Sequence, residues 1–213
     1  MTITKEQIAK DLLSIRAVFL KPDDPFTWAS GIHSPIYCDN RLTLSAPAVR
    51  KDVEAGLAEI VKDKFPEAEM LMGTSTAGIA HAAITATILD LPMGYVRSGH
   101  KDHGRQNQIE GKMEPGTKVV VIEDLISTGG SVLEVVDVLR QAGAQVLGIA
   151  SIFTYGLQKG VERLAAADVV NYSLSDFDTL SKVAAAEGYI ADKDIAKLTA
   201  FQKNPQDPAW MEL

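Results

Sequence analysis

The chain has 213 residues, 46% hydrophobic and 23% charged, a composition that suits a globular protein with a single domain over residues 1–213. Its 21 basic and 28 acidic residues give a net charge of −7, which argues against nucleic acid or an anionic membrane as a partner, because both attract positive charge. A single cysteine, Cys38, excludes an internal disulfide, and neither a signal peptide nor a membrane-spanning apolar run is visible, so we expect a cytoplasmic protein.

The first third of the chain contains two helical patterns with an irregular segment between them. Thr4 and Gln7 resemble a capping box, and the apolar residues that follow at helical spacing predict a helix over residues 5–18. Residues 20–44 carry proline, glycine, serine and aromatic residues without a period, which predicts short strands and turns. Helical spacing then returns over residues 46–64.

From residue 69 onward, short apolar runs alternate with helical patterns. The predicted order is strand 69–72, helix 79–89, strand 93–97, strand 118–123, helix 131–142, strands 145–152 and 168–170, and one or two helices after about residue 174. This alternation indicates an α/β fold with a central, mostly parallel sheet flanked by helices. We interpret His81, within a predicted helix, and Cys38 as packing residues.

Three loops leave the carboxyl ends of predicted strands, at residues 73–78, 97–111 and 123–131. The carboxyl ends of parallel strands meet at the same edge of a sheet, and ligands of open α/β sheets bind beyond that edge. We therefore expect the three loops to form one binding site.

The loop at 123–131 joins two kinds of group. Glu123 and Asp124 come first, and carboxylates accept hydrogen bonds from vicinal hydroxyls such as those of a ribose. Small residues then lead into a predicted helix, whose first N–H groups and dipole attract an anion. We name these residues the phosphate loop: Ser127, Thr128, Gly129, Gly130 and Ser131. An ordinary strand–helix turn also contains glycine, but the paired acids favour a sugar phosphate site.

The segment VVVIEDLISTGGS, residues 119–131, resembles the diphosphoribosyl-binding signature of type I phosphoribosyltransferases. The resemblance implies that family's α/β fold, with a small hood formed by about residues 20–44 plus C-terminal elements. It implies that Glu123 and Asp124 hold the ribose hydroxyls of phosphoribosyl diphosphate (PRPP) and that the phosphate loop binds its 5-phosphate. It also implies Mg²⁺ on the diphosphate, without an assigned protein ligand.

The segment GTSTAGIA, residues 73–80, is similar to the pyrophosphate loop of the same family. Its glycines, Gly73 and Gly78, allow close approach of backbone N–H groups to a diphosphate. The resemblance implies that PRPP is also bound here, by Thr74, Ser75 and Thr76.

The loop at 97–111 combines cations and glycines on a segment without a period, which predicts a lid that closes on an anion. Its sequence KDHG at 101–104 resembles the mobile catalytic loop of orotate phosphoribosyltransferases. The resemblance implies that Lys101 and His103 bind PRPP and act in catalysis, with Arg97 beside them. It further implies a homodimer with shared active sites, because this loop reaches into the neighbouring subunit in that family.

The segment FTWASGIHSPIYCDNR, residues 26–41, resembles the orotate-binding segment of those enzymes. The resemblance implies orotate contacts from Ser30, Ile36, Tyr37 and Arg41, together with Thr128. Some relatives place an arginine for the orotate carboxylate after the strand at 145–152, and none follows here. We therefore hypothesise that Arg41, the one full cation of the segment, meets that carboxylate.

The implied reaction is transfer of ribose 5-phosphate from PRPP to N1 of orotate, giving orotidine 5′-monophosphate and pyrophosphate in pyrimidine (UMP) biosynthesis. The implied catalytic residues are Lys101, His103 and Asp124; for Asp124 we favour holding the ribose over shuttling a proton. One alternative is a phosphoribosyltransferase for a purine or uracil, which the lid and the 26–41 segment disfavour. Another is a non-enzymatic regulator that senses PRPP and binds RNA or DNA, which the negative charge disfavours.

Overall fold

The computed structural model describes residues 3–28, 31–97, 99 and 108–213. Its helices are α1 (Lys5–Ser14), η1 (Asn40–Ser45), α2 (Pro47–Lys64), α3 (Ala77–Leu89), α4 (Gly130–Gln141), α5 (Gln158–Ala166), α6 (Phe177–Ala186), α7 (Asp194–Lys203) and η3 (Pro208–Glu212). Its strands are β1 (Val18–Leu20), β2 (Phe26–Thr27), β3 (His33–Ser34), β4 (Ile36–Cys38), β5 (Met70–Thr74), β6 (Met93–Val96), β7 (Ile109–Glu110), β8 (Lys118–Ile126), β9 (Gln145–Thr154) and β10 (Asn171–Asp176).

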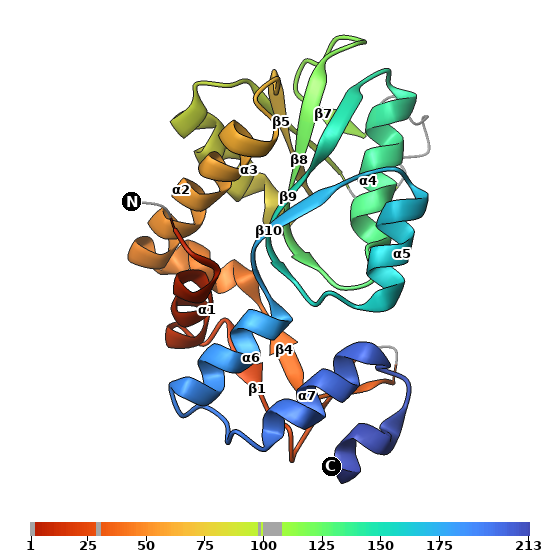
Figure 1. The fold of residues 1–213 in the computed structure, drawn as a ribbon. Helices are drawn as coiled ribbons and strands as arrows, with labels where there is room; N and C mark the ends of the chain where they lie inside the picture. Colours follow the sequence, from red (N-terminus) through yellow and green to blue (C-terminus); the bar gives the residue numbers. More distant parts are fainter. Residues whose placement is uncertain (1–2, 29–30, 98, 100–107) are drawn as a thin grey trace.

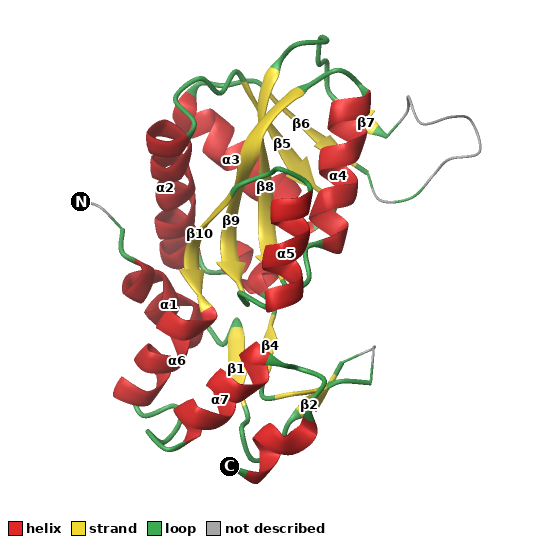
Figure 2. Cartoon of the chain, turned by 45° about the vertical axis from the view of Figure 1, so that its right-hand side comes forward, coloured by secondary structure: helices red, strands yellow, loops and turns green. Residues whose placement is uncertain are grey.

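Six of the described strands form the central sheet, in the order β10-β9-β8-β5-β6-β7. All neighbours pair in parallel except β7, which runs antiparallel to β6. Helices α2 and α3 cover one face of this sheet, and α4 and α5 cover the other (Figures 1 and 2). The predicted α/β fold with a mostly parallel sheet flanked by helices is therefore confirmed.

The middle strand β8 explains why a continuous apolar run was needed in the sequence. Side chains alternate between the two faces of a strand. Val120 and Ile122 accordingly join the core beneath α2 and α3, whereas Val119 and Val121 join the core beneath α4. All four are fully buried. A strand covered on both faces cannot carry polar residues until it reaches the edge of the sheet, which here is at Glu123.

The hood residues and the C-terminal helices pack against each other below the sheet (Figure 2). Trp28, which follows the β2–β3 hairpin's first strand, lies 5.8 Å from Phe201 of α7, measured between ring centroids. Phe201 in turn lies 5.6 Å from Trp210 of η3. Lys197 adds an ion pair to Asp23 at 2.6 Å. These contacts place the C-terminal 20 or so residues beside the hood.

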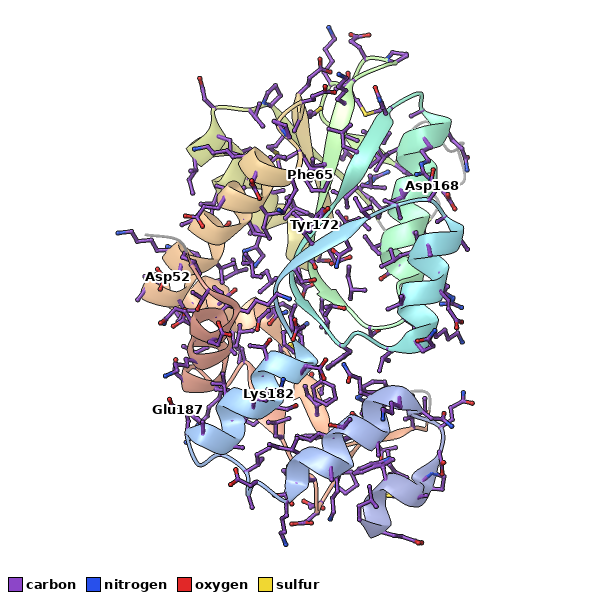
Figure 3. All side chains as sticks on the ribbon, in the orientation of Figure 1. Asp52, Phe65, Asp168, Tyr172, Lys182 and Glu187 are labelled. Atoms are coloured by element: carbon purple, nitrogen blue, oxygen red, sulfur yellow. The ribbon has the colours of Figure 1, made fainter. Side chains whose placement is uncertain are left out.

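At one end of the sheet order, the edge strand β10 packs against the end of α2. Tyr172 of β10 meets Phe65 edge-on, with ring centroids 5.7 Å apart (Figure 3). Lys64 lies over the same tyrosine ring, 5.6 Å from its centroid. These contacts join the end of α2 to β10.

Several predicted element boundaries are corrected. The first helix ends at Ser14 rather than 18, because Arg16 takes a left-handed backbone conformation (φ 58°) and Val18 begins β1. The last strand of the sheet is β10 at 171–176, after the apolar run at 168–170. Helix α5 was not predicted; Gly160 is its one buried residue, and its Val161 is exposed. The helices after about residue 174 are confirmed as α6 and α7, the first starting at Phe177.

Candidate active site

The carboxyl ends of β5, β6 and β8 meet at one edge of the sheet and surround a cavity of about 310 Å³. Its lining includes seven of the residues expected to bind PRPP: Thr74, Ser75, Thr76, Arg97, Glu123, Asp124 and Ser131. The other phosphate loop residues are not among its lining; they connect β8 to α4 at the same edge. The three predicted loops are therefore brought together as expected from strand order.

The two acids of β8 have different environments. Glu123 is buried, and its Oε1 accepts hydrogen bonds from the Thr74 hydroxyl and from the Asp124 N–H, both at 2.8 Å. Burial, followed by the neighbouring carboxyl of Asp124, raises the pKa of Glu123 to about 8. Asp124 is half-buried and more open to the cavity. The carboxylate at 124 is therefore the better placed of the two to meet a ligand directly.

The loop between β5 and α3 is fixed closely against β8. A side chain at Gly78 would collide with the Ile122 carbonyl oxygen and the Thr74 hydroxyl, so only glycine fits. Ser75 donates from its hydroxyl to the Val96 carbonyl at 2.6 Å, which ties the loop to β6 as well. The Ser75–Thr76 peptide bond is cis. Thr74 is buried, whereas Thr76 is exposed at the cavity, so the threonines at 74 and 76 have different roles.

The phosphate loop is held from outside by α5. Gly129 takes a left-handed conformation (φ 73°) and precedes the first residue of α4. Arg163 of α5 donates from Nη1 to the Thr128 carbonyl at 3.2 Å. Gly160 lies so close that an added Cβ would be 2.7 Å from the Ser127 carbonyl oxygen. The loop's carbonyls thus face α5, an orientation that leaves its N–H groups for an anion.

Arg97 stands where the lid loop leaves the sheet. It follows β6, lines the cavity, and forms an ion pair from Nε to Glu110 Oε1 at 3.3 Å. Its N–H also donates to the Gln108 carbonyl at 2.9 Å, so the segment returns to the sheet beside its starting point. Lys101 and His103 lie outside the described residues.

The residues expected to contact orotate are only partly gathered. Ser30 lies outside the described residues. The Ile36 side chain is fully buried, while the next residue along β4, Tyr37, is exposed and packs at a tilt against Phe26, with ring centroids 5.7 Å apart. Thr128 lies in the phosphate loop.

The guanidinium of Arg41 is paired with a neighbouring acid. Its Nε and Nη2 donate to the two carboxylate oxygens of Asp39, at 2.6 and 2.7 Å. This contact, with a smaller contribution from Asp124, raises the pKa of Arg41. The Arg41 side chain is 65% exposed, so its guanidinium is also accessible to anions other than Asp39.

The packing roles assigned to His81 and Cys38 are confirmed. His81 is fully buried, with Nδ1 2.6 Å from Glu54 Oε1. Cys38 is buried and contacts Asn40, and burial raises the pKa of its thiol well above the ordinary value. Asn40 itself was not predicted: its Nδ2 donates to the Asp124 carbonyl at 2.7 Å, and no local pattern relates residues 84 positions apart.

Residues 43–181 match the family model described as the phosphoribosyl transferase domain. The chain is 59% identical to the orotate phosphoribosyltransferase of Bacillus cytotoxicus over 97% of this chain and 99% of that protein. It is also 59% identical to that of Bacillus subtilis, over 99% and 97%. The orotate phosphoribosyltransferase structure from Aeropyrum pernix superposes with a TM-score of 0.74 at 29% identity, covering 86% of this chain and 99% of that one. The chain therefore belongs to the orotate phosphoribosyltransferases, within the type I phosphoribosyltransferase family.

Proposed function

We propose that this chain transfers ribose 5-phosphate from PRPP to N1 of orotate, giving orotidine 5′-monophosphate and pyrophosphate, a step of pyrimidine (UMP) biosynthesis. One observation carries the proposal. An acid pair, an anion-binding helix start and a glycine-flanked loop meet at one strand-end edge, in a chain 59% identical to orotate phosphoribosyltransferases along almost its whole length.

PRPP is expected to lie across this edge. The N–H groups of the phosphate loop and the start of α4 bind the 5-phosphate. Asp124 accepts hydrogen bonds from the ribose hydroxyls, and Glu123, held by Thr74, supports it. Ser75, Thr76 and Arg97 line the far side of the cavity and bind the diphosphate. The donor is thereby held at both ends with C1 of the ribose exposed to the acceptor.

In the reaction, the bond between C1 and the diphosphate oxygen breaks, and pyrophosphate leaves with the electron pair. The N1 nitrogen of orotate forms the new bond to C1 and loses its proton. Positive charge develops on the ribose ring as the bond breaks, and negative charge on the leaving group. Residues that bind the departing charge more strongly in the transition state accelerate the step; we assign this work to Arg97, Lys101 and His103.

Mg²⁺ fits the chemistry of the cavity. The cavity lining offers oxygen donors from Asp124 and Thr76, which suit a hard cation. No three His, Cys, Asp or Glu side chains are grouped to hold a metal in the described part of the chain. Most ligands of the ion would then come from the diphosphate and water. When bound, Mg²⁺ would neutralise diphosphate charge; chelation should abolish turnover, and added Mg²⁺ should restore it.

The lid is proposed to act across a homodimer. Arg97 and Gln108 are joined by a hydrogen bond and both line the cavity, so the two ends of the loop lie close together beside it. The family resemblance places such a loop in the neighbouring subunit. We therefore propose a homodimer with shared active sites.

PRPP and orotate are the proposed partners, without nucleic acid or membrane. The net charge of −7 opposes the phosphate backbone and the anionic lipid surface. No helix in the described ranges is long and apolar enough to span a bilayer. The single buried thiol of Cys38 is in keeping with the proposed cytoplasmic location.

The acceptor is tested by following the PRPP-dependent loss of orotate absorbance and comparing adenine, guanine and uracil as acceptors. Turnover with orotate alone is the expected result. Turnover with a purine or uracil instead would support the alternative transferase. PRPP binding without turnover of any base would support the regulator.

A further inference from the structure

A buried cluster of polar side chains lies between α2, α3 and η1, next to the active-site edge. Glu54 of α2, His81 and Thr85 of α3, and Thr43 of η1 are all 0–1% exposed. Both oxygens of the Glu54 carboxylate are engaged: Oε1 lies 2.6 Å from His81 Nδ1, and Oε2 accepts from the Thr85 hydroxyl at 2.9 Å. A buried carboxylate is costly unless it is paired in this way. Such a cluster fixes α2, α3 and η1 relative to one another.

The cluster continues to the active site through Thr43 and Asn40. The Thr43 hydroxyl lies 3.4 Å from His81 Nε2 and donates to the Asn40 carbonyl at 2.6 Å. Asn40 is fully buried, and its side-chain amide donates to the carbonyl oxygen of Asp124 at 2.7 Å. Its Oδ1 lies 3.2 Å from the Cys38 sulfur. Polar contacts therefore connect Glu54 to the backbone of Asp124 through His81, Thr43 and Asn40.

The hydrogen bond from Asn40 reaches β8 where its pairing with β5 has already ended. Pairing between β5 and β8 ends at Gly73 and Ile122, two residues before Asp124. Asn40 supplies a donor to β8 beyond that point, where β5 has already turned into its loop. It therefore holds the peptide that carries the Asp124 side chain. The same short helix carries Arg41, the residue proposed for orotate.

We propose that Asn40 is a positioning residue for the reaction, and that the Glu54–His81–Thr43 cluster holds it in place. Asn40 acts through Asp124: it sets where the carboxylate meets the ribose hydroxyls and fixes the η1 segment beside the donor site. The proposal rests on the proposed function, because it presumes PRPP at the acid pair.

The test is a double-mutant cycle between Asn40→Leu and Asp124→Ala, read as PRPP affinity by calorimetry and as kcat and KM. Leucine keeps the branched shape of asparagine without the amide. Asn40→Leu should weaken PRPP binding about tenfold in the natural chain, the effect of one buried hydrogen bond. In the Asp124→Ala background it should cost no more than about twofold, since no carboxylate remains to be positioned.

The matched control is Asn171→Leu on β10, two strands from β8, where the lost amide donates to Ser173 Oγ at 2.8 Å. It should lower Tm and leave PRPP affinity unchanged. If Asn40→Leu does not fold, Thr43→Val removes only the hydroxyl that holds Asn40, and the same cycle applies with a loss of about threefold. Equal losses in both backgrounds, or unchanged PRPP affinity in a folded variant, would overturn the proposal. A natural chain that binds PRPP but does not convert orotate would instead count against the proposed function.

Discussion

The hydroxyl of Thr74 donates to Oε1 of Glu123 at 2.8 Å, joining the last residue of β5 to the first acidic residue of β8. Both groups are buried, and the same carboxylate oxygen also accepts from the Asp124 N–H. Glu123 therefore links the end of β5 to β8 next to Asp124. The first acid of the strand end therefore shapes the site, and we propose that the second, Asp124, meets the ligand.

The raised pKa of Glu123 predicts how stability depends on pH. The folded chain keeps this proton up to about pH 8, whereas the unfolded chain loses it near the ordinary value of 4.5. Unfolding therefore releases a proton between these values, and the contribution of Glu123 to stability falls as pH rises through that window. Glu123→Gln cannot ionise, so its Tm should exceed the natural Tm by a margin that grows from about pH 5 to about pH 8.

The control for this experiment is Glu162→Gln, the same change at an exposed carboxylate of α5. Its Tm difference from the natural chain should stay nearly constant across the range. A constant difference for Glu123→Gln as well would contradict a buried carboxyl that titrates near neutral pH.

The contact of α5 with the phosphate loop predicts an effect of Gly160→Ala on the donor. The new methyl would lie 2.7 Å from the Ser127 carbonyl oxygen, so the loop backbone must shift. Because the loop N–H groups must point at the 5-phosphate, PRPP KM should rise about tenfold while orotate KM changes little. Val161→Ala, at an exposed position of the same helix, is the control and should leave both constants unchanged. An unaltered PRPP KM in Gly160→Ala would show that the loop does not need α5.

The proposed contact of Arg41 with the orotate carboxylate predicts how its removal affects acceptor binding. Arg41→Ala should raise orotate KM about tenfold or more, the effect of losing a charged hydrogen bond, with PRPP affinity unchanged. Lys21→Ala removes another hood cation, which pairs with Asp24, and serves as the control. The hypothesis is falsified if Arg41→Ala leaves orotate KM as it is in the natural chain.

The sequence predicted those elements whose pattern lies in residues that are close together in the chain. β8 and α4 were predicted because four apolar residues, two acids and a glycine loop follow one another directly. The predicted position of β10 was wrong because most of its residues carry polar side chains instead of forming an apolar run. Some of these side chains belong to a Ser151–Asn171–Ser173 cluster that only the folded sheet creates. Helix α5 lacked a broad apolar face, since its contact with the phosphate loop is made by a glycine and an arginine.

The same reasoning applies to the site. Strand order predicted that the residues at 74–76, 97 and 123–124 would meet, and they line one cavity. The different environments of Glu123 and Asp124 were not predicted, because they depend on Thr74 from another strand. The contact of Asn40 with Asp124 joins residues far apart in the chain and has no sequence signature.

The proposed catalytic role of Lys101 predicts how removal of its charge affects kcat. Lys101→Ala should lower kcat far more than it weakens PRPP binding, because the lid acts as charge develops on pyrophosphate. Lys112→Ala, an exposed lysine just after β7, is the control and should keep a natural kcat. A natural kcat in Lys101→Ala would rule out the lid mechanism.

Sharing of the active site is tested with the same variant. Mixed dimers of Lys101→Ala and Asp124→Ala subunits contain one intact site if the lid crosses the interface, and should recover part of the activity that both parents lack. Confirmed heterodimers without recovery would contradict a shared site.

PRPP binding and turnover at the acid pair of β8 are tested most directly by Asp124→Asn, which removes the charge and preserves the side-chain shape. PRPP titrations and the orotate assay should be run on this variant, the natural chain and Asp137→Asn, a carboxylate on α4 outside the cavity lining. We predict PRPP-dependent orotate consumption by the natural chain and Asp137→Asn, with both affinity and turnover reduced at least about tenfold in Asp124→Asn. Natural affinity and turnover in Asp124→Asn would contradict the placement of the ribose at this edge.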